Sequence, residues 1–285
     1  MKKLLLLILV ILSIVLGYSW ANTISEQKSQ IANQELKKTT ILRFAIVSDS
    51  HNDNELLGKA LEQAKGEGIN FVVGLGDYTN IGTLDELRVA KAVFDGSMLS
   101  YFASSGDHDL WDSRNQGNEA INNFRQVFGE SSHSLERDGI QIVILDNSDI
   151  YNGIDSESWE FLNRALAKCS GSDEQNREKL KCSKLTFVMA HKTPFHPESK
   201  HVMGENSTVV ANQANGLIQL IEENNVDGFF SGDLHFFAQF KTPADTVKIT
   251  TIGAVTEERN FQGPRFGLVT VYSDYTWEVE DVEIR

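Results

Sequence analysis

Short apolar runs alternate with amphipathic stretches along most of the chain. The run Ile41–Val47 is apolar enough to predict a buried strand, and the period of polar and apolar positions over Asn54–Lys65 predicts a helix after it. Further strands are predicted at Asn70–Val73, Leu99–Ala103, Ile140–Leu145, Leu185–Met189 and Gly228–Phe230. Further helices are predicted at Leu84–Phe94, Gly117–Phe128, Ser156–Ala167 and Val209–Glu223. This alternation indicates a layered α/β fold.

The pattern changes after Phe236, where only strands are predicted, at Val247–Ile252, Gly267–Tyr272 and Trp277–Ile284. The helical period is missing from this part of the chain. We therefore expect the late strands to add an edge to the sheet.

The first 40 residues do not share the alternation. Residues 1–21 begin with two lysines, continue as an aliphatic run and end in Ser19-Trp20-Ala21, which is the layout of a secretory signal peptide. The aliphatic run is shorter than the roughly 20 residues that a membrane-spanning helix needs. Residues 22–40 are polar and predict a tether, which leaves 41–285 as one domain. We expect a secreted or extracytoplasmic protein, with an uncleaved membrane anchor as the alternative.

Composition narrows the classes of partner. The 285 residues contain 26 Lys and Arg against 40 Asp and Glu, a net charge of −14, which argues against a nucleic acid duplex as partner. The two cysteines, Cys169 and Cys182, are too few for a disulfide scaffold or a four-cysteine zinc site. In an exported protein they predict a disulfide, with two free thiols as the alternative.

Five of the predicted strands run directly into short loops that hold Asp or His. These loops are Ser48–His51, Gly76–Asn80, Gly106–Asp109, Ala190–Pro194 and Ser231–His235. In open α/β sheets, ligands bind at the carboxyl ends of the strands. Imidazole and carboxylate together suit Mn, Fe or Zn. A single Asp after a strand is usually a turn or cap residue, so only the five loops together predict a metal site.

Other residues give weaker evidence of a functional role. His133 and His201 lie outside these loops and are assigned to surface or packing roles. Lys192 could bring positive charge to a phosphate, but a lysine on so acidic a protein is more often a solvated surface residue. The chain lacks the Gly-x-Ser-x-Gly elbow of serine hydrolases, and Gly74-Leu75-Gly76 lacks the third glycine of a dinucleotide loop.

Taken in order, the five loops resemble the signature of the calcineurin-like metallophosphoesterases. That signature is Asp-x-His, Gly-Asp, Gly-Asn-His-Asp/Glu, a lone His, and Gly-His-x-His, and the likeness extends over residues 41–255. The resemblance implies a four-layer α/β/β/α sandwich with two mixed sheets. It also implies hydrolysis of a phosphomonoester or phosphodiester by a metal-bridging hydroxide at a dinuclear centre.

The resemblance also implies roles for single residues. The first metal ion would be held by Asp49, His51, Asp77 and His235. Asp77 would bridge to the second ion, whose other ligands would be Asp107, His191 and Asp233. His108 would lie near the phosphate as an electrophile or general acid, and Asp109 would orient its imidazole.

Two positions depart from the family pattern. Asp107 stands where the family has Asn, and Asp233 stands where it has the first His of Gly-His-x-His. The ligand set then has four carboxylates instead of two, and its second half changes from nitrogen towards oxygen donors. We therefore expect two divalent ions, with Mn or Fe favoured and Mg, Zn or Ca as alternatives.

A phosphorylated small molecule or other phosphoester is the expected substrate, and contact with a membrane is expected only if the leader is uncleaved. Purple acid phosphatases carry a tyrosine three residues after the bridging Asp, whereas this chain has Asn80 there, so no purple chromophore is expected.

The alternative function is a catalytically weak or inactive metal-binding protein of the same fold with a binding or structural role. His108 favours the enzyme, because a structural site needs no proton donor.

Overall fold

The computed structural model describes Trp20, residues 38–167 and residues 183–285. The predicted signal peptide and most of the predicted tether lie outside these residues, as do Cys169 and Cys182, so those predictions stay predictions. No helix in the described parts of the chain has the length and apolar character needed to span a membrane.

Five strands form the first mixed sheet, in the order β11-β10-β1-β2-β3. Their bounds are β1 Thr40–Val47, β2 Phe71–Gly74, β3 Tyr101–Ala103, β10 Arg265–Tyr272 and β11 Trp277–Glu283. β1 is parallel to β2 and antiparallel to β10. The two last strands of the chain therefore lie on the opposite side of β1 from β2.

Six strands form the second mixed sheet, in the order β4-β5-β6-β7-β9-β8. Their bounds are β4 His133–Arg137, β5 Ile140–Leu145, β6 Leu185–Ala190, β7 Gly228–Ser231, β8 Ala238–Lys241 and β9 Lys248–Thr251. The four inner strands are parallel, and the outer strands β4 and β8 are antiparallel to their neighbours.

Two details of the sheets differ from expectation. The late strands do not all form an edge, because β10 lies inside the first sheet and β9 inside the second. The strands β4 and β8 were not predicted, since both are short edge strands without a buried residue and so lack an apolar run.

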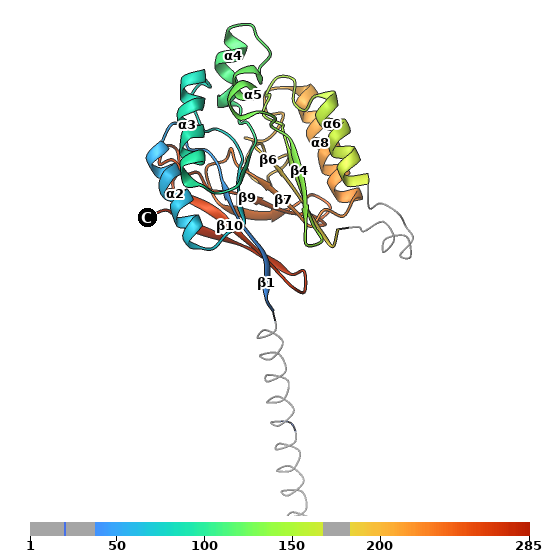
Figure 1. Ribbon diagram of the computed structural model, residues 1–285. Helices are drawn as coiled ribbons and strands as arrows, with labels where there is room; N and C mark the ends of the chain where they lie inside the picture. The colour runs from blue at the N-terminus through green and yellow to red at the C-terminus, as the bar shows by residue number, and fades with distance from the viewer. Residues whose placement is uncertain (1–19, 21–37, 168–182) are drawn as a thin grey trace, which may run out of the picture.

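Helices cover the outer faces of both sheets (Figure 1). Their bounds are α2 Asn54–Gly66, α3 Leu84–Ser97, α4 Trp111–Asn115, α5 Asn122–Phe128, α6 Ser156–Ala167 and α8 Thr208–Glu223, with a 3₁₀ turn at His108–Leu110. Figure 1 shows α2 and α3 on one side of the molecule and α6 and α8 on the other. The helix predicted from Gly117 begins only at Asn122, because Gly117 has a left-handed φ of 76° that a helix does not allow.

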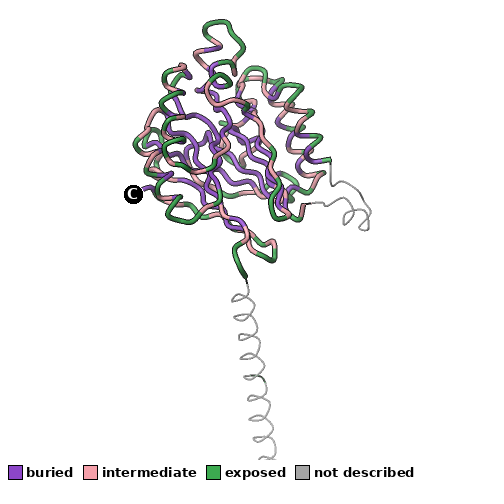
Figure 2. Tube along the Cα trace, in the orientation of Figure 1, coloured by how far each residue is buried: buried purple, intermediate pink, exposed green. Residues whose placement is uncertain are grey.

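Three layers of buried apolar side chains separate these elements. One lies between the first sheet and helices α2, α3 and α5, and another between the second sheet and helices α6 and α8. The third lies between the two sheets and includes Phe44, Phe187 and Phe230. Figure 2 shows the buried strands running through the centre of the molecule between more exposed helices. The predicted α/β/β/α sandwich with two mixed sheets is therefore confirmed.

We expect Phe187→Ala to lower the free energy of unfolding by about 3–5 kcal/mol, because it removes a ring from the layer between the sheets. Phe187 is fully buried, and its ring lies 5.7 Å from that of Phe230 and 5.1 Å from that of Trp277. Urea unfolding of the metal-free protein measures the change. Phe261→Ala is the matched control, since Phe261 is 80% exposed and should change stability by less than about 0.5 kcal/mol. Equal losses in the two variants would contradict this packing.

Candidate metal centre

The polar loops that follow β1, β2, β3, β6 and β7 meet where the strand ends of the two sheets come together. Backbone hydrogen bonds join them: the amide of Asp49 donates to the carbonyl of Gly76 (3.0 Å), and the amide of Gly232 donates to the carbonyl of His191 (2.9 Å). The amide of Thr256, after β9, donates to the carbonyl of Asp49 (3.0 Å). The site is thus built across both sheets.

Several of the loop residues have left-handed backbones. The φ angles are 57° at Asp49, 43° at His51, 52° at Asp77, 66° at Asp233 and 58° at His235. Such angles are uncommon for residues other than glycine and cluster at functional sites. Each one turns the chain sharply at a strand end, which brings its side chain toward the common centre.

Two glycines allow the loops to approach one another. A Cβ atom on Gly106 would overlap the backbone nitrogen and Oδ1 of Asp77, and one on Gly232 would overlap Oγ of Ser48. The same Cβ on Gly232 would lie 2.8 Å from Oδ2 of Asp49. A residue with a side chain at either position would therefore push a candidate ligand away.

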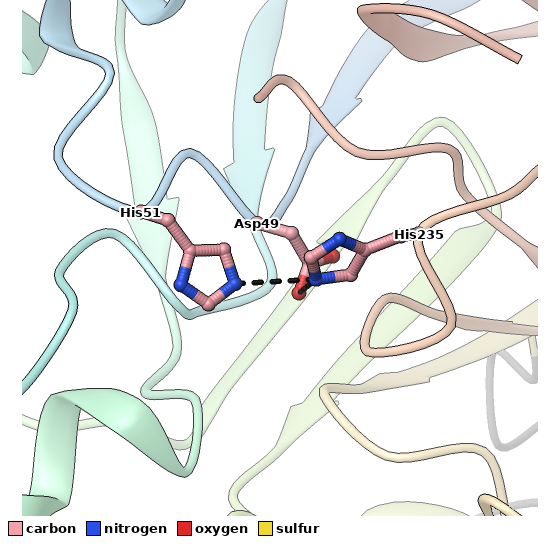
Figure 3. Close-up of side chains that lie close together, drawn as sticks. All are labelled: Asp49, His51 and His235. Carbon is pink, nitrogen blue, oxygen red and sulfur yellow. Dashed lines mark hydrogen bonds and ion pairs between the residues drawn. The ribbon is translucent and has the colours of Figure 1, made fainter. Parts of the chain in front are cut away.

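Asp49, His51 and His235 form the first group of candidate ligands (Figure 3). The two imidazole Nε2 atoms lie 3.2 Å apart, and Nε2 of His235 lies 3.7 Å from Oδ1 of Asp49. All three side chains are buried. Nδ1 of His235 faces the carbonyl of Glu258 at 2.9 Å, which fixes that proton and leaves the Nε2 lone pair directed at the group. These donors fit a transition metal ion.

Asp77 lies between the first group and a second one. Its Oδ2 is 3.6 Å from Nε2 of His51 and 3.6 Å from Nε2 of His191. Its Oδ1 accepts a hydrogen bond from the backbone amide of His108 (2.9 Å). A carboxylate in this place can face two sites at once.

Asp107, His191 and Asp233 form the second group. Nε2 of His191 lies 3.4 Å from Oδ1 of Asp107 and 3.8 Å from Oδ1 of Asp233, and no hydrogen-bond partner for this nitrogen lies among the described residues. Nδ1 of His191 faces the carbonyl of Leu75 at 2.7 Å, as expected of a histidine held to present Nε2. Together, the two groups of buried His and Asp are consistent with a dinuclear metal site.

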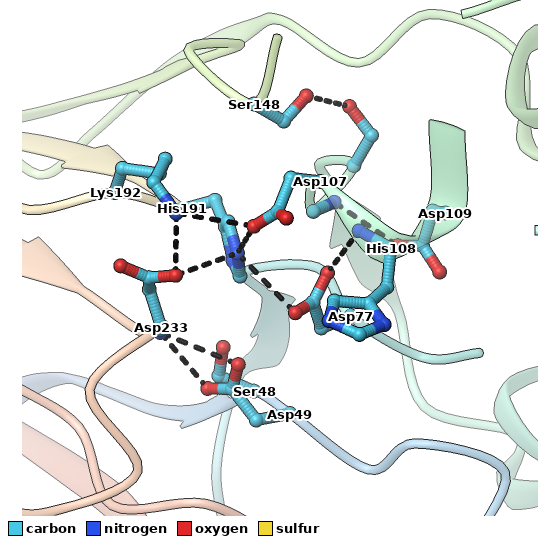
Figure 4. A network of polar contacts seen from close by, with 12 residues as sticks. Ser48, Asp49, Asp77, Asp107, His108, Asp109, Ser148, His191, Lys192 and Asp233 are labelled. Carbon is cyan, nitrogen blue, oxygen red and sulfur yellow. Dashed lines mark hydrogen bonds and ion pairs between the residues drawn. The ribbon is translucent and has the colours of Figure 1, made fainter. Parts of the chain in front are cut away.

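The second group also contains Lys192 (Figure 4). Its Nζ donates to Oδ1 of Asp233 at 2.6 Å and to Oδ1 of Asp107 at 3.1 Å. Only 6% of the side chain is exposed. The interpretation of Lys192 as a solvated surface residue is therefore wrong. The signal in the sequence was a basic residue directly beside a candidate ligand, in a chain with two extra acidic residues at the same site.

His201 lies at the surface, as expected, with 53% of its side chain exposed, but it also contacts the site. Its Nε2 lies 3.3 Å from Oδ1 of Asp233, and its Nδ1 lies 2.7 Å from Oε2 of Glu205. No motif pointed to it, because it lies ten residues after His191 in a polar loop. By contrast, Nε2 of His133 bonds the carbonyl of Ala103 (3.0 Å), which agrees with a packing role.

The predicted role of Asp109 is wrong. The imidazole of His108 is held by the carbonyl of Asn80, 2.8 Å from Nδ1, and stacks on Trp111 with the ring centres 3.9 Å apart. The carboxylate of Asp109 instead accepts hydrogen bonds from the backbone amide of Thr79 (3.1 Å), its hydroxyl (2.8 Å) and the amide of Gly106 (3.0 Å). Asp109 thus joins the loops after β2 and β3, and burial raises its pKa to about 6.

Burial and neighbouring charges set the protonation of the metal-free site. Burial lowers the pKa of His51 to about 4, so this imidazole is neutral at pH 7. Burial alone would lower the pKa of His191, but the carboxylates around it, Asp77 first, raise it well above its ordinary value. Burial would raise the pKa of Asp233, but Lys192 holds it well below its usual range. A metal ion at the second group would therefore have to displace a proton.

Known protein families were compared with the sequence, and one family model matches it. The family model for calcineurin-like phosphoesterases matches residues 42–237. No curated protein sequence matches the chain.

Several solved structures resemble the chain. A dimetal phosphatase from Danio rerio has a TM-score of 0.55 and 15% identity, over 87% of this chain and 100% of that one. The purple acid phosphatase PPD1 from yellow lupin has a TM-score of 0.56 and 16% identity, over 84% of this chain and 52% of the lupin chain. GAP50, the anchor in the inner membrane complex of Plasmodium, has a TM-score of 0.56 and 13% identity, over 87% and 90%. At such identities the likeness shows a shared fold.

We expect His201 of the metal-free protein to titrate near pH 9. The hydrogen bond to Asp233 raises the pKa of this imidazole to about 9. Because the folded pKa lies above the unfolded value of about 6.5, the stabilisation by His201 is complete below about pH 6.5 and is lost as the pH rises through 9. NMR titration of the imidazole measures this, and Asp233→Asn should return the pKa toward about 6.5. Titration of the wild-type residue near pH 6.5 would contradict the contact.

Proposed function

The chain belongs to the calcineurin-like phosphoesterase family, and from that premise we propose that it is a metal-dependent hydrolase of phosphomonoesters or phosphodiesters. The observation that carries the proposal is the first group of ligands, Asp49, His51 and His235, buried beside Asp77 with His108 at its side. The rings of His51 and His108 lie edge to face with their centres 4.7 Å apart. A residue able to transfer protons therefore lies next to a site able to hold a metal ion.

The first group would hold a divalent ion through the imidazoles of His51 and His235 and the carboxylates of Asp49 and Asp77. This mixture of nitrogen and oxygen donors favours Mn or Fe, with Mg, Zn or Ca as alternatives. A divalent ion held there supplies Lewis acidity toward a phosphoryl oxygen and lowers the pKa of water.

His108 is the proposed proton donor to the leaving alcohol oxygen. The Asn80 carbonyl accepts the proton on Nδ1, which supports the imidazolium form and leaves Nε2 to hold the proton that is transferred. Burial lowers the pKa of His108, so the imidazolium gives up that proton more readily than an exposed histidine would. Stacking on Trp111 limits the rotation of the ring.

Asp109 supports the site as a positioning residue. It bonds the loop of Thr79, which follows Asp77, and the loop of Gly106, which precedes Asp107. The two candidate ligands are therefore held at a fixed separation by a carboxylate that does not reach the centre.

A second candidate is a protein of the same fold that binds without turnover. The observation in its favour is Lys192, whose ammonium lies between the two carboxylates of the second group. GAP50 is described as an anchor, which gives an example of a similar fold in a different kind of role. The extracytoplasmic location belongs to the proposal as well and is supported by the sequence of residues 1–21, with a membrane anchor as its alternative.

The test is hydrolysis of a nitrophenyl phosphomonoester and a bis-nitrophenyl phosphodiester with each candidate metal in turn. We expect metal-dependent turnover that is abolished in Asp49→Asn, because this variant loses a ligand carboxylate. His108→Gln should lower the turnover rate about 10²- to 10⁴-fold, the usual contribution of a general acid. His133→Gln is the matched control and should keep full activity, since His133 bonds the carbonyl of Ala103 outside the site. No turnover by a folded, metal-loaded protein would favour the binding candidate.

A further inference from the structure

The second group of ligands already contains a cation. Three carboxylate oxygens face Nε2 of His191: Oδ1 of Asp107 at 3.4 Å, Oδ2 of Asp77 at 3.6 Å and Oδ1 of Asp233 at 3.8 Å. Nζ of Lys192 donates to two of these oxygens, Oδ1 of Asp107 at 3.1 Å and Oδ1 of Asp233 at 2.6 Å. A second metal ion held by these two carboxylates would lie close to the ammonium. Nε2 of His191, Oδ2 of Asp77 and Oδ2 of Asp233 have no bond to Lys192, but a divalent ion that reached them would lie beside a fixed positive charge.

We propose that Lys192 takes the place of the second metal ion, so that this centre binds one divalent ion through Asp49, His51, Asp77 and His235. This inference rests on the proposed function, because it concerns the same site. Lys192 is then a positioning residue, whose charge holds Asp107 and Asp233 together in the way that a shared metal ion would.

Lys192 is fixed at its backbone as well as at its ammonium group. Oδ1 of Asn147 accepts a hydrogen bond from the amide of Lys192 (2.9 Å), and Nδ2 of Asn147 donates to its carbonyl (2.7 Å). Asn147 is itself buried, with 1% exposed. These bonds hold the residue at the strand end, and only 6% of its side chain is exposed.

The partners of Lys192 are the two positions that depart from the family pattern. A neutral Asn and a neutral His at positions 107 and 233 would leave the buried ammonium without a carboxylate bonded to it, which is costly. Asp107 and Asp233 supply that counter-charge. The lysine and the two departures therefore form one unit, and the additional carboxylates compensate a fixed cation instead of attracting a harder metal ion.

Other charged groups face the same oxygens. Nε2 of His201 lies 3.3 Å from Oδ1 of Asp233, the oxygen that Lys192 also contacts. Oδ1 of Asp233 therefore has three side-chain nitrogens within 4 Å without any metal ion, those of Lys192, His201 and His191. Asp49, in the first group, instead accepts from the backbone amide of Asp233 and contacts no Lys or Arg in the described part of the chain.

The test measures how many Mn ions each chain binds and records their electron paramagnetic resonance spectrum. Metal-free protein is titrated with Mn²⁺, free ion is removed, and bound Mn is measured by mass spectrometry and by electron paramagnetic resonance. We expect wild type to bind one Mn per chain with the spectrum of an isolated ion. Lys192→Met removes the charge and should bind two, with the spectrum of an exchange-coupled pair. Lys192→Gln gives a second neutral variant that keeps a hydrogen-bond donor.

Two control variants isolate the charge. Lys192→Arg keeps a cation and should bind one Mn, whereas Lys200→Met removes an exposed lysine of the same loop and should also leave the count at one. Two coupled Mn per chain in wild type would overturn the inference. An unchanged count of one in both neutral variants would overturn it too, because another feature would then exclude the second ion.

The same experiment separates this inference from the proposed function. Hydrolysis by wild type with two bound ions would contradict the role of Lys192 and leave the phosphoesterase standing. One bound ion without hydrolysis of either ester would contradict the phosphoesterase and leave the role of Lys192 standing. Wild type that binds no Mn would overturn both.

Discussion

The structure depends on placing four carboxylates, Asp49, Asp77, Asp107 and Asp233, at one edge of two sheets with almost no exposure to water. Burying an ionised carboxylate without partners is very costly, and burying four together adds repulsion among them. The protein supplies Lys192 as a fixed cation, His191 as a group that can take a proton, and His201 at the rim. Asp49 has no Lys or Arg beside it among the described residues, and a metal ion would be held there and at Asp77.

The sandwich makes this concentration of charge feasible. Parallel strands in both sheets end at the same edge. The short loops that follow them, from the loop of Asp49 to the loop of His235, therefore meet there. Left-handed residues and two glycines then bring these loops within hydrogen-bonding distance of one another. The apolar layer between the sheets holds the two edges in register, since neither sheet alone carries a complete set of ligands.

The sequence predicted the inner strands and the main helices, because buried strands are continuous apolar runs and the helices keep an amphipathic period. It did not predict β4 and β8, because neither of these short edge strands contains a buried residue and so neither has an apolar run. The ligand loops were predicted because five motifs recur in order. Lys192 and His201 were missed, since no local pattern distinguishes a buried lysine from a solvated one. Their roles depend on contacts with Asp233, which is 41 residues from Lys192 along the chain.

A fixed ammonium and a bound metal ion differ in what they do to folding. A site that depends on two metal ions gains stability from their binding, because its carboxylates repel one another when no ion is bound. A buried ion pair is no guarantee of added stability, since desolvation offsets much of its attraction. What Lys192 does is to remove the dependence of one half of the centre on metal supply: Asp107 and Asp233 have their counter-charge as soon as the chain folds. On this proposal, the loops after β3 and β7 would keep their arrangement in the metal-free protein, and only the half around Asp49 and His51 would depend on a bound ion.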